Sequence, residues 1–94
     1  MAGYSCIRVR WQHGHADEPV DLWSELDAAR LETRKLEIFR DGRIGYASAD
    51  EEYGGTRRGE GAVPSIGDIA SDTQFEPQEV SKAEFENLWD KRRG

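Results

Sequence analysis

The chain has 94 residues, of which 34% are charged and 36% are hydrophobic, and its net charge is −6. This length is typical of one domain with a modest core, so we expect residues 1–94 to form a single domain. Binding to nucleic acid or to an anionic membrane needs a surplus of Lys and Arg, and we therefore expect neither partner. Three Trp, three Tyr and three Phe residues are too many for a disordered chain.

Cys6 is the only cysteine, which excludes an intramolecular disulfide and removes any need for an oxidising compartment. No apolar run is long enough to cross a bilayer. The segment 1–6 also lacks the charged and then apolar pattern of a signal peptide. We therefore expect the protein to be cytoplasmic.

Apolar and polar residues alternate in the two N-terminal segments 4–11 and 20–27, as they do in half-buried strands. Ile7 and Val9 mark the apolar positions of the first segment, and Leu22 and Leu26 mark those of the second. Residues 20–35 include several good helix formers and could instead form a helix. The clean alternation favours the strand.

The segments 31–39 and 43–48 flank Asp41-Gly42, which is a strong signal for a β-hairpin with a two-residue turn. This turn fixes the register and predicts that Phe39 pairs with Ile44 and that Leu36 pairs with Ala47. Large residues then lie opposite the small Gly45 and Ala47. We expect another element to pack closely against that face.

The segment 49–64 is rich in glycine and charge and has no periodicity, so it is predicted to be a long loop. Ser65 is a plausible N-cap for a short helix over 65–71. Residues 72–80 are expected to be extended, with Pro77 near the middle.

The pattern from Ser81 onwards indicates a C-terminal helix, because Ser81 and the glutamate three residues later form a capping box. Phe85 and Trp89 lie on its apolar stripe. We expect these two side chains to fill the space beside Gly45 and Ala47. The elements together predict an α+β fold: an antiparallel four-stranded sheet, a C-terminal helix packed on one face, and a short additional helix.

Four features of the sequence resemble chemical sites. The segment 13–18 holds two His, one Asp and one Glu, which is only part of a metal site and is more typical of a solvated loop. Residues 50–52 are acidic but lack the ligand spacing of a calcium loop. Residues 54–59 do not match a phosphate-binding loop, and Cys6 has no His nearby in the sequence to activate it. We therefore expect no metal, no cofactor and no catalytic residue, and we expect that the protein is not an enzyme.

The sheet face opposite the helix is the better candidate for a site. If Ile7, Val9 and Leu22 face the helix, then a set of aromatic and charged residues faces away from it. Aromatic residues and Arg dominate the binding energy of many interfaces, so we predict that this set binds a partner. Alternatively, the loop 49–64 folds over this face and buries it. The predicted partner-binding residues are Arg8, Arg10, Trp23, Glu25, Phe39 and Tyr46.

Three segments are similar to a family of small bacterial proteins of unknown function. They are WSELD at 23–27, RKLEIFRDGRIGYA at 34–47, and EVSKAEFE at 79–86. The resemblance extends over residues 4–89 and implies no activity, ligand or catalytic residue.

Small acidic bacterial domains of this general type are often toxin-neutralising immunity proteins or accessory factors. By analogy, our first hypothesis is a protein that binds another protein, as an immunity-type inhibitor or a regulator. The alternative hypothesis is a module that binds a small molecule or nucleotide through the loop 49–64. The oligomeric state is left open between a monomer and a homodimer.

Overall fold

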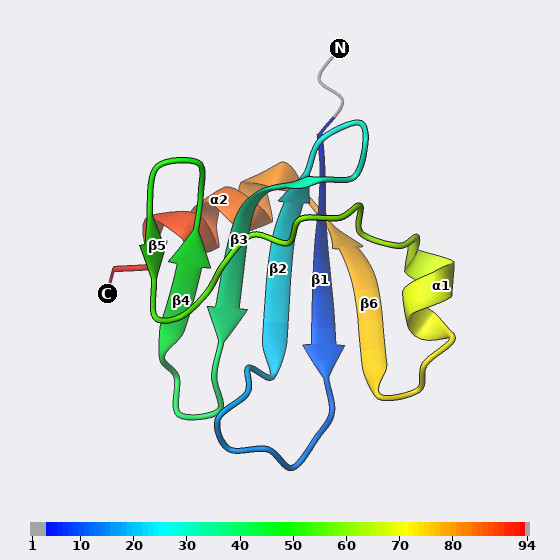
Figure 1. Ribbon diagram of the computed structural model, residues 1–94, viewed down its shortest axis with the longest axis horizontal. Coiled ribbons are helices and arrows are strands. Elements are labelled where there is room, and N and C mark those ends of the chain that lie inside the picture. The colour runs from blue at the N-terminus through cyan, green and yellow to red at the C-terminus, as the bar shows by residue number, and fades with distance from the viewer. Residues whose placement is uncertain (1–3, 94) are drawn as a thin grey trace.

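The computed structural model describes residues 4–93 and has an α+β fold, built on a six-stranded antiparallel sheet with strand order β5-β4-β3-β2-β1-β6 (Figure 1). Residues 1–3, which belong to the segment read for a signal peptide, and residue 94 lie outside the described residues. The elements are β1 (Ser5–Trp11), β2 (Asp21–Leu26), β3 (Glu32–Ile38), β4 (Ile44–Ala47), β5 (Glu52–Tyr53), α1 (Ile66–Ala70), β6 (Phe75–Val80) and α2 (Lys82–Asp90). No helix in this part of the chain is both long and apolar enough to cross a membrane.

The α+β class is confirmed, but the predicted count of four strands is too low. The strand interpretation of 20–27 is confirmed by β2. The additional strands are β5, a two-residue strand within the predicted loop, and β6, which follows α1 and pairs with β1. Neither carries the apolar alternation by which the first strands were identified.

Pro77 lies within β6, at a position where the sheet tolerates a residue without an N–H. The Gln12 N–H donates to the Gln74 carbonyl at 2.8 Å. Because antiparallel pairs alternate between bonded and non-bonded, this contact places the Pro77 nitrogen on the outer edge of the sheet. Pro77 therefore costs β6 no ladder bond, and it removes a donor from an edge that could recruit a foreign strand.

The predicted hairpin exists, but its register is off by one residue. The Phe39 N–H donates to the Arg43 carbonyl at 2.9 Å, so the loop has three residues rather than two. Leu36 consequently pairs with Tyr46, and not with Ala47. Gly42 takes φ of +93°, a left-handed conformation that glycine adopts without steric cost. A slip of one residue moves the side chains of β4 to the opposite face from the one predicted.

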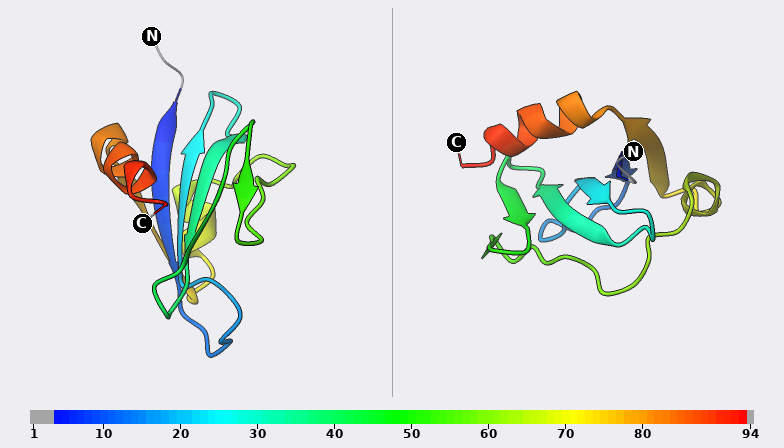
Figure 2. Two further views of the ribbon diagram at one scale, coloured as in Figure 1. Left: turned by 90° about the vertical axis from the view of Figure 1, so that its left-hand side faces the viewer. Right: turned by 90° about the horizontal axis from the view of Figure 1, so that it is seen from above.

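The two faces of the sheet are covered by different elements (Figure 2). The helix α2 lies on one face, which we call the helix face. Its Phe85 and Trp89 pack on Cys6, Leu36 and Tyr46. The expectation that these two side chains sit beside Gly45 and Ala47 is wrong, since register places those small residues on the opposite face.

The opposite face, which we call the loop face, is crossed by the segment 54–64, as Figure 1 shows. Thr56 is only 1% exposed, and its hydroxyl donates to Glu37 Oε1 at 2.7 Å. A Cβ added to Gly45 would lie 2.1 Å from Thr56 Oγ1. The small residue therefore does admit a close neighbour, but the neighbour is the loop and not the helix.

Both predicted helices are confirmed at their first residues. Ser81 and Glu84 form the reciprocal capping box, with both hydrogen bonds at 3.0 Å. The Ser65 hydroxyl accepts from the Asp68 N–H at 3.2 Å and so caps α1. These local bonds satisfy backbone donors that a helix start otherwise leaves unpaired.

Candidate functional site

The structure places most of the predicted partner-binding residues on the helix face. Arg8 pairs with Trp23 across β1 and β2, and Trp23 pairs with Leu36 across β2 and β3. Leu36 packs against α2, so all three residues lie on the helix face. Glu25 and Arg10 share this face by the same alternation. The premise that these four residues face away from α2 is therefore wrong, because alternation alone did not reveal which face receives the helix. Their role in binding a partner stays a prediction.

The other two predicted residues project from opposite faces of the sheet, although both border one depression at its β4 edge. Tyr46 lies under α2, with its ring 5.9 Å from that of Trp89 in an edge-to-face arrangement. Phe39 lies on the loop face, with the Arg43 guanidinium 4.7 Å from its ring centroid. The six residues therefore do not form one continuous surface.

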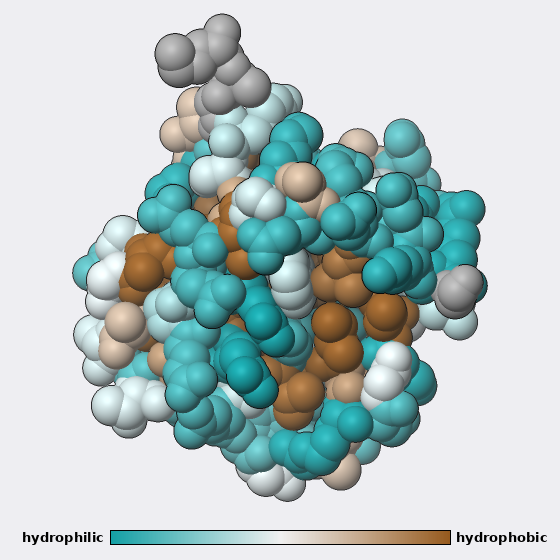
Figure 3. Space-filling model, turned by 180° about the vertical axis from the view of Figure 1, so that it is seen from behind, coloured by the Kyte–Doolittle hydropathy of each residue, from teal (hydrophilic) through white to brown (hydrophobic). Residues whose placement is uncertain are grey.

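Arg8, Asp21 and Trp23 form a contact set at the lower part of the helix face. The Arg8 guanidinium forms an ion pair with Asp21 at 2.7 Å and lies 5.2 Å from the Trp23 ring centroid. The bond to Asp21 raises the pKa of Arg8. Figure 3 views the molecule from this side and shows apolar patches separated by polar residues. An ion pair therefore lies beside Trp23 in the area that the sequence had suggested as an aromatic interface.

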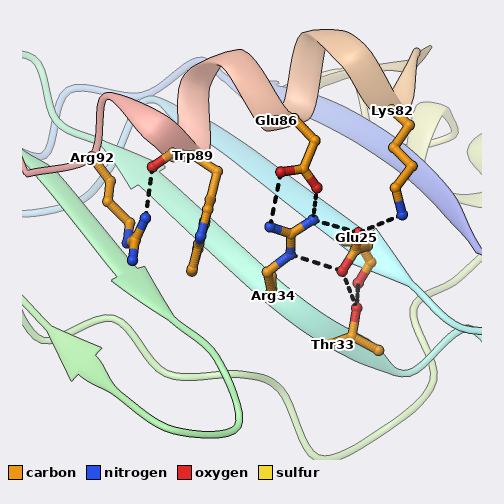
Figure 4. Close-up of polar contacts among 7 residues, drawn as sticks. All are labelled: Glu25, Thr33, Arg34, Lys82, Glu86, Trp89 and Arg92. Carbon is orange, nitrogen blue, oxygen red and sulfur yellow. Dashed lines mark hydrogen bonds and ion pairs between the residues drawn. The ribbon is translucent and has the colours of Figure 1, made fainter.

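Arg34 stands between the sheet and α2 at the centre of an ion-pair network (Figure 4). Its guanidinium binds Glu25 of β2 at 2.7 Å and also Glu86 of α2. The hydrogen bond from Arg34 lowers the pKa of Glu25 to about 2, against the opposing effect of burial, and Thr33 adds a further bond. The same guanidinium lies 5.0 Å from the ring of Phe85. These contacts fix α2 on the sheet, so we assign Glu25 a structural role in the folded chain.

Buried polar groups hold the loop against the other face. Glu32, 9% exposed, accepts from the Ser24 hydroxyl at 2.7 Å and from the Gly59 N–H at 2.5 Å. The Lys35 ammonium lies 3.9 Å from Glu32 and 3.7 Å from Glu37. Each carboxylate thus has a compensating partner, as buried charges require. The segment 54–64 therefore covers the sheet face opposite α2, but the residues that the loop was expected to bury, Arg8 and Trp23 among them, lie on the helix face instead.

The segment 54–64 leaves part of the loop face open, between itself and α1. The opening is a groove of about 370 Å³, with Ser24, Glu32 and Lys35 at its polar end and Asp68 and Asp72 on the side of α1. We call it the sheet groove. Its apolar lining residues, most of them half-buried, are Ile7, Val9, Leu22, Val63, Ile69 and Phe75.

The C-terminal end of α2 approaches β4 and β5 at the opposite edge of the sheet (Figures 1 and 2). A second depression lies there. Its volume is about 680 Å³. We call it the Arg–Tyr hollow. It is lined by Phe39, Arg43, Ile44, Gly45, Tyr46, Tyr53, Gly54, Arg92 and Arg93.

Sequence reasoning did not find the arginines of this hollow. Basic residues are favourable at the C-terminal end of any helix, so the presence of Arg92 and Arg93 after α2 does not by itself indicate a site. In the fold, both donate to Glu51, at 2.8 and 2.5 Å, and both lie over the Tyr46 ring. More than forty positions separate Glu51 from them, and no local pattern indicates such a contact.

The other chemical candidates do not assemble into a reactive site within residues 4–93. Cys6 is buried, and burial raises the pKa of its thiol, which opposes formation of a nucleophilic thiolate. The His13 ring contacts the Pro19 carbonyl at 2.8 Å and the His15 N–H at 2.9 Å. In the described residues, no group of three or more His, Cys, Asp or Glu could hold a metal ion.

Comparison with known proteins adds a family and no activity. No curated protein and no solved structure matches the chain. A family model described as a domain of unknown function (DUF6881) matches residues 5–94, which is nearly the whole sequence. The resemblance to a family of unknown function is thereby confirmed. The chain belongs to the DUF6881 family.

Proposed function

We propose that the protein is a non-enzymatic, partner-binding domain that receives an apolar side chain of another protein in the sheet groove. The observation that carries the proposal is the groove itself. Val9, Leu22, Ile69 and Phe75 remain half-buried there, on a face that is otherwise covered by the loop. Half-buried apolar side chains gathered in one concavity are typical of interaction sites.

The charges around the groove favour a basic partner segment. Asp68 and Asp72 line its outer side and are exposed, and Glu32 lies at its inner end. Lys35 is the one basic residue among the residues that line it. A partner segment with an apolar residue flanked by Lys or Arg matches both the lining and the charge. A second copy of this acidic chain matches the charge less well, so the proposal commits to a different protein.

Retention of a partner from the source cells tests the proposal. The wild type is compared with Ile69→Ser, which shortens an apolar lining residue, and with Asp68→Lys/Asp72→Lys, which reverses the charge of the rim. We expect both variants to bind the retained protein at least about tenfold more weakly, as loss of an interface anchor does. The matched control is Asp50→Lys/Asp90→Lys, which makes the same charge change at exposed positions away from the groove.

Equal retention by the groove variants and by the control would show that the groove is not the binding surface. A synthetic peptide with leucine between lysines provides a direct probe. A peptide with leucine between glutamates is its negative control. We expect amide shifts in β1, β2 and α1 with the lysine peptide alone. Concentration-dependent dimerisation that Ile69→Ser abolishes would overturn the choice of a different protein as the partner.

An immunity-type inhibitor, which acts by binding a toxin, is a narrower form of the same proposal. Such inhibitors work by occupying a surface of the toxin, and they need no catalytic group of their own. A toxin gene next to the gene for this chain supports the narrower form, and transfer of toxin resistance by this gene tests it. Resistance that survives Asp68→Lys/Asp72→Lys would exclude the groove as its basis.

A further inference from the structure

We propose that the Arg–Tyr hollow is a separate site that binds a small ligand carrying both a planar aromatic ring and a phosphate group, such as a nucleoside monophosphate. The hollow lies at the β5 edge of the sheet, whereas the sheet groove lies towards α1 and β6. Its volume of about 680 Å³ falls within the range of sites for small ligands. Part of its wall comes from the segment 49–64, through Tyr53 and Gly54.

Tyr53 supplies the surface for the aromatic part of the ligand. Among the large hydrophobic residues that the structure describes, Tyr53 is highly exposed, at 61%. Tyr46, its neighbour across the β4–β5 pair, stacks on it with ring centroids 5.2 Å apart and an angle of 20°. Because Tyr46 is buried beneath α2, it holds Tyr53 in place. An aromatic ring that is already ordered loses little entropy when a ligand ring stacks on it.

Arg43, Arg92 and Arg93 supply the anion-binding part. Three guanidinium groups meet two carboxylates there, since Asp41 pairs with Arg43 and Glu51 pairs with both Arg92 and Arg93. The hollow is therefore net positive on a chain whose total charge is −6. Guanidinium groups suit phosphate because they present several donors in a planar fork.

Arg92 is the best positioned of the three. Its side chain is only 16% exposed, and its guanidinium lies 4.2 Å from the Trp89 ring centroid and 5.0 Å from that of Tyr46. Its Nε is buried and has no hydrogen-bond partner in the described residues. Its terminal nitrogens donate to the Trp89 carbonyl and to Glu51, and these bonds hold the guanidinium in the wall of the hollow.

The backbone leaves the edge of β4 open at this point. β5 ends at Tyr53, and positive φ angles at Gly54 and Gly55, of +74° and +83°, bend the chain beside Gly45 instead of continuing the ladder. The ladder alternation then directs the Ile44 N–H towards the open edge, because Phe39 pairs with Arg43 and Tyr46 with Tyr53. A backbone N–H beside guanidinium groups adds a donor for a phosphate oxygen.

Titration of the ¹⁵N-labelled protein tests the proposal with four probes: AMP, phenyl phosphate, adenosine and inorganic phosphate. We expect AMP or phenyl phosphate to shift the amides of residues 43–46, 53–54 and 92–93. Adenosine and inorganic phosphate each carry one half of the required chemistry, and we expect them to bind at least about tenfold more weakly. The tighter of the two full probes identifies whether the ring is a nucleobase or a simple aryl group.

Two variants with matched controls connect binding to the named side chains. We expect Tyr53→Ala and Arg93→Gln each to weaken the tighter full probe about tenfold. The control Tyr4→Ala removes another exposed tyrosine, and Arg58→Gln removes an exposed arginine that does not line the hollow. Both controls should bind as the wild type does.

The proposal is overturned if neither full probe shifts these amides, or if inorganic phosphate binds as tightly as AMP and phenyl phosphate. Equal binding by Tyr53→Ala and Tyr4→Ala overturns it as well. Because Tyr53 and Arg93 are exposed, loss of folding is not expected for either variant, and the unchanged amide spectrum of the ligand-free protein checks this point. Binding that Asp68→Lys/Asp72→Lys leaves unchanged separates this site from the sheet groove.

Discussion

Substitution of Gly45 by alanine gives the sharpest test of how the loop is seated. The added Cβ would lie 2.1 Å from Thr56 Oγ1 and 3.2 Å from the Tyr53 carbonyl oxygen. Thr56 is 1% exposed and bonded to Glu37, so it cannot move without breaking that bond. Overpacking costs about 1–3 kcal/mol, and loss of a hydrogen bond to a carboxylate costs about 2 kcal/mol. We expect Gly45→Ala to lower the free energy of unfolding by about 3 kcal/mol.

The double variant Gly45→Ala/Thr56→Ala separates the clash from a general effect of alanine in a strand. Thr56→Ala alone should cost about 2 kcal/mol, through the lost bond to Glu37. In the double variant the clashing oxygen is absent, and only the two contacts of 3.2 Å remain, with the Cβ of residue 56 and with the Tyr53 carbonyl oxygen. We expect a total of about 3 kcal/mol instead of the additive value of about 5 kcal/mol.

Thr56→Val is the matched control, because valine keeps the shape of threonine and lacks the hydroxyl. With Gly45→Ala it retains the steric conflict, so its double variant should stay close to additivity. Urea unfolding followed by tryptophan fluorescence measures all five variants and the wild type. If the losses in the free energy of unfolding are additive for Gly45→Ala/Thr56→Ala, then Thr56 does not pack on Gly45. That result would also refute the conclusion that the segment 54–64 covers the loop face.

Three further predictions concern the stability of single elements. Because Arg34 holds the pKa of Glu25 near 2 against an ordinary 4.5, the stabilisation from Glu25 is complete above pH 4.5 and is lost as the pH falls towards 2. Urea unfolding over that pH range should show a smaller loss of stability in Arg34→Met than in the wild type. An identical pH dependence in the two proteins would contradict the stabilising pair of Arg34 and Glu25. Gly42→Ala, at φ of +93°, should cost about 1 kcal/mol or more, whereas Gly14→Ala, with no atom within 4 Å of the new Cβ, should cost little. Ser81→Ala removes the N-cap of α2 and should cost about 1 kcal/mol in the same assay.

Local signals in the sequence predicted the elements whose stabilising contacts are themselves local. The capping box starting at Ser81 and the N-cap at Ser65 are bonds within four residues, and both helices begin where these signals indicate. The strands of the hairpin were also found. Its register was not, because a Gly immediately before Arg43 fits a two-residue turn and also a three-residue loop with Gly42 in the left-handed conformation.

The assignment of faces could not be read from alternation, since both faces of this sheet are covered. Cys6 and Ile7 are neighbours in β1, and both are buried, one beneath α2 and the other on the loop face. Alternation distinguishes a buried face from a solvated one, and it is weak when neither face is solvated. Sequence reasoning therefore placed Trp23 on the wrong side of the sheet relative to α2.

The two proposed sites explain why the net charge of the chain is a poor guide to its ligands. A charge of −6 favours a basic partner, and the sheet groove beside Asp68 and Asp72 agrees with that. At the other edge of the sheet, Arg92 and Arg93 create a positive site from the C-terminal end of the chain. Exposed charges act over about 8 Å at physiological ionic strength, so each site responds to its own neighbours. Added salt should therefore weaken the binding of a lysine-flanked peptide at the groove and also the binding of a phosphate ester at the hollow. If the net charge alone governed binding, the chain would attract the peptide but not the phosphate ester.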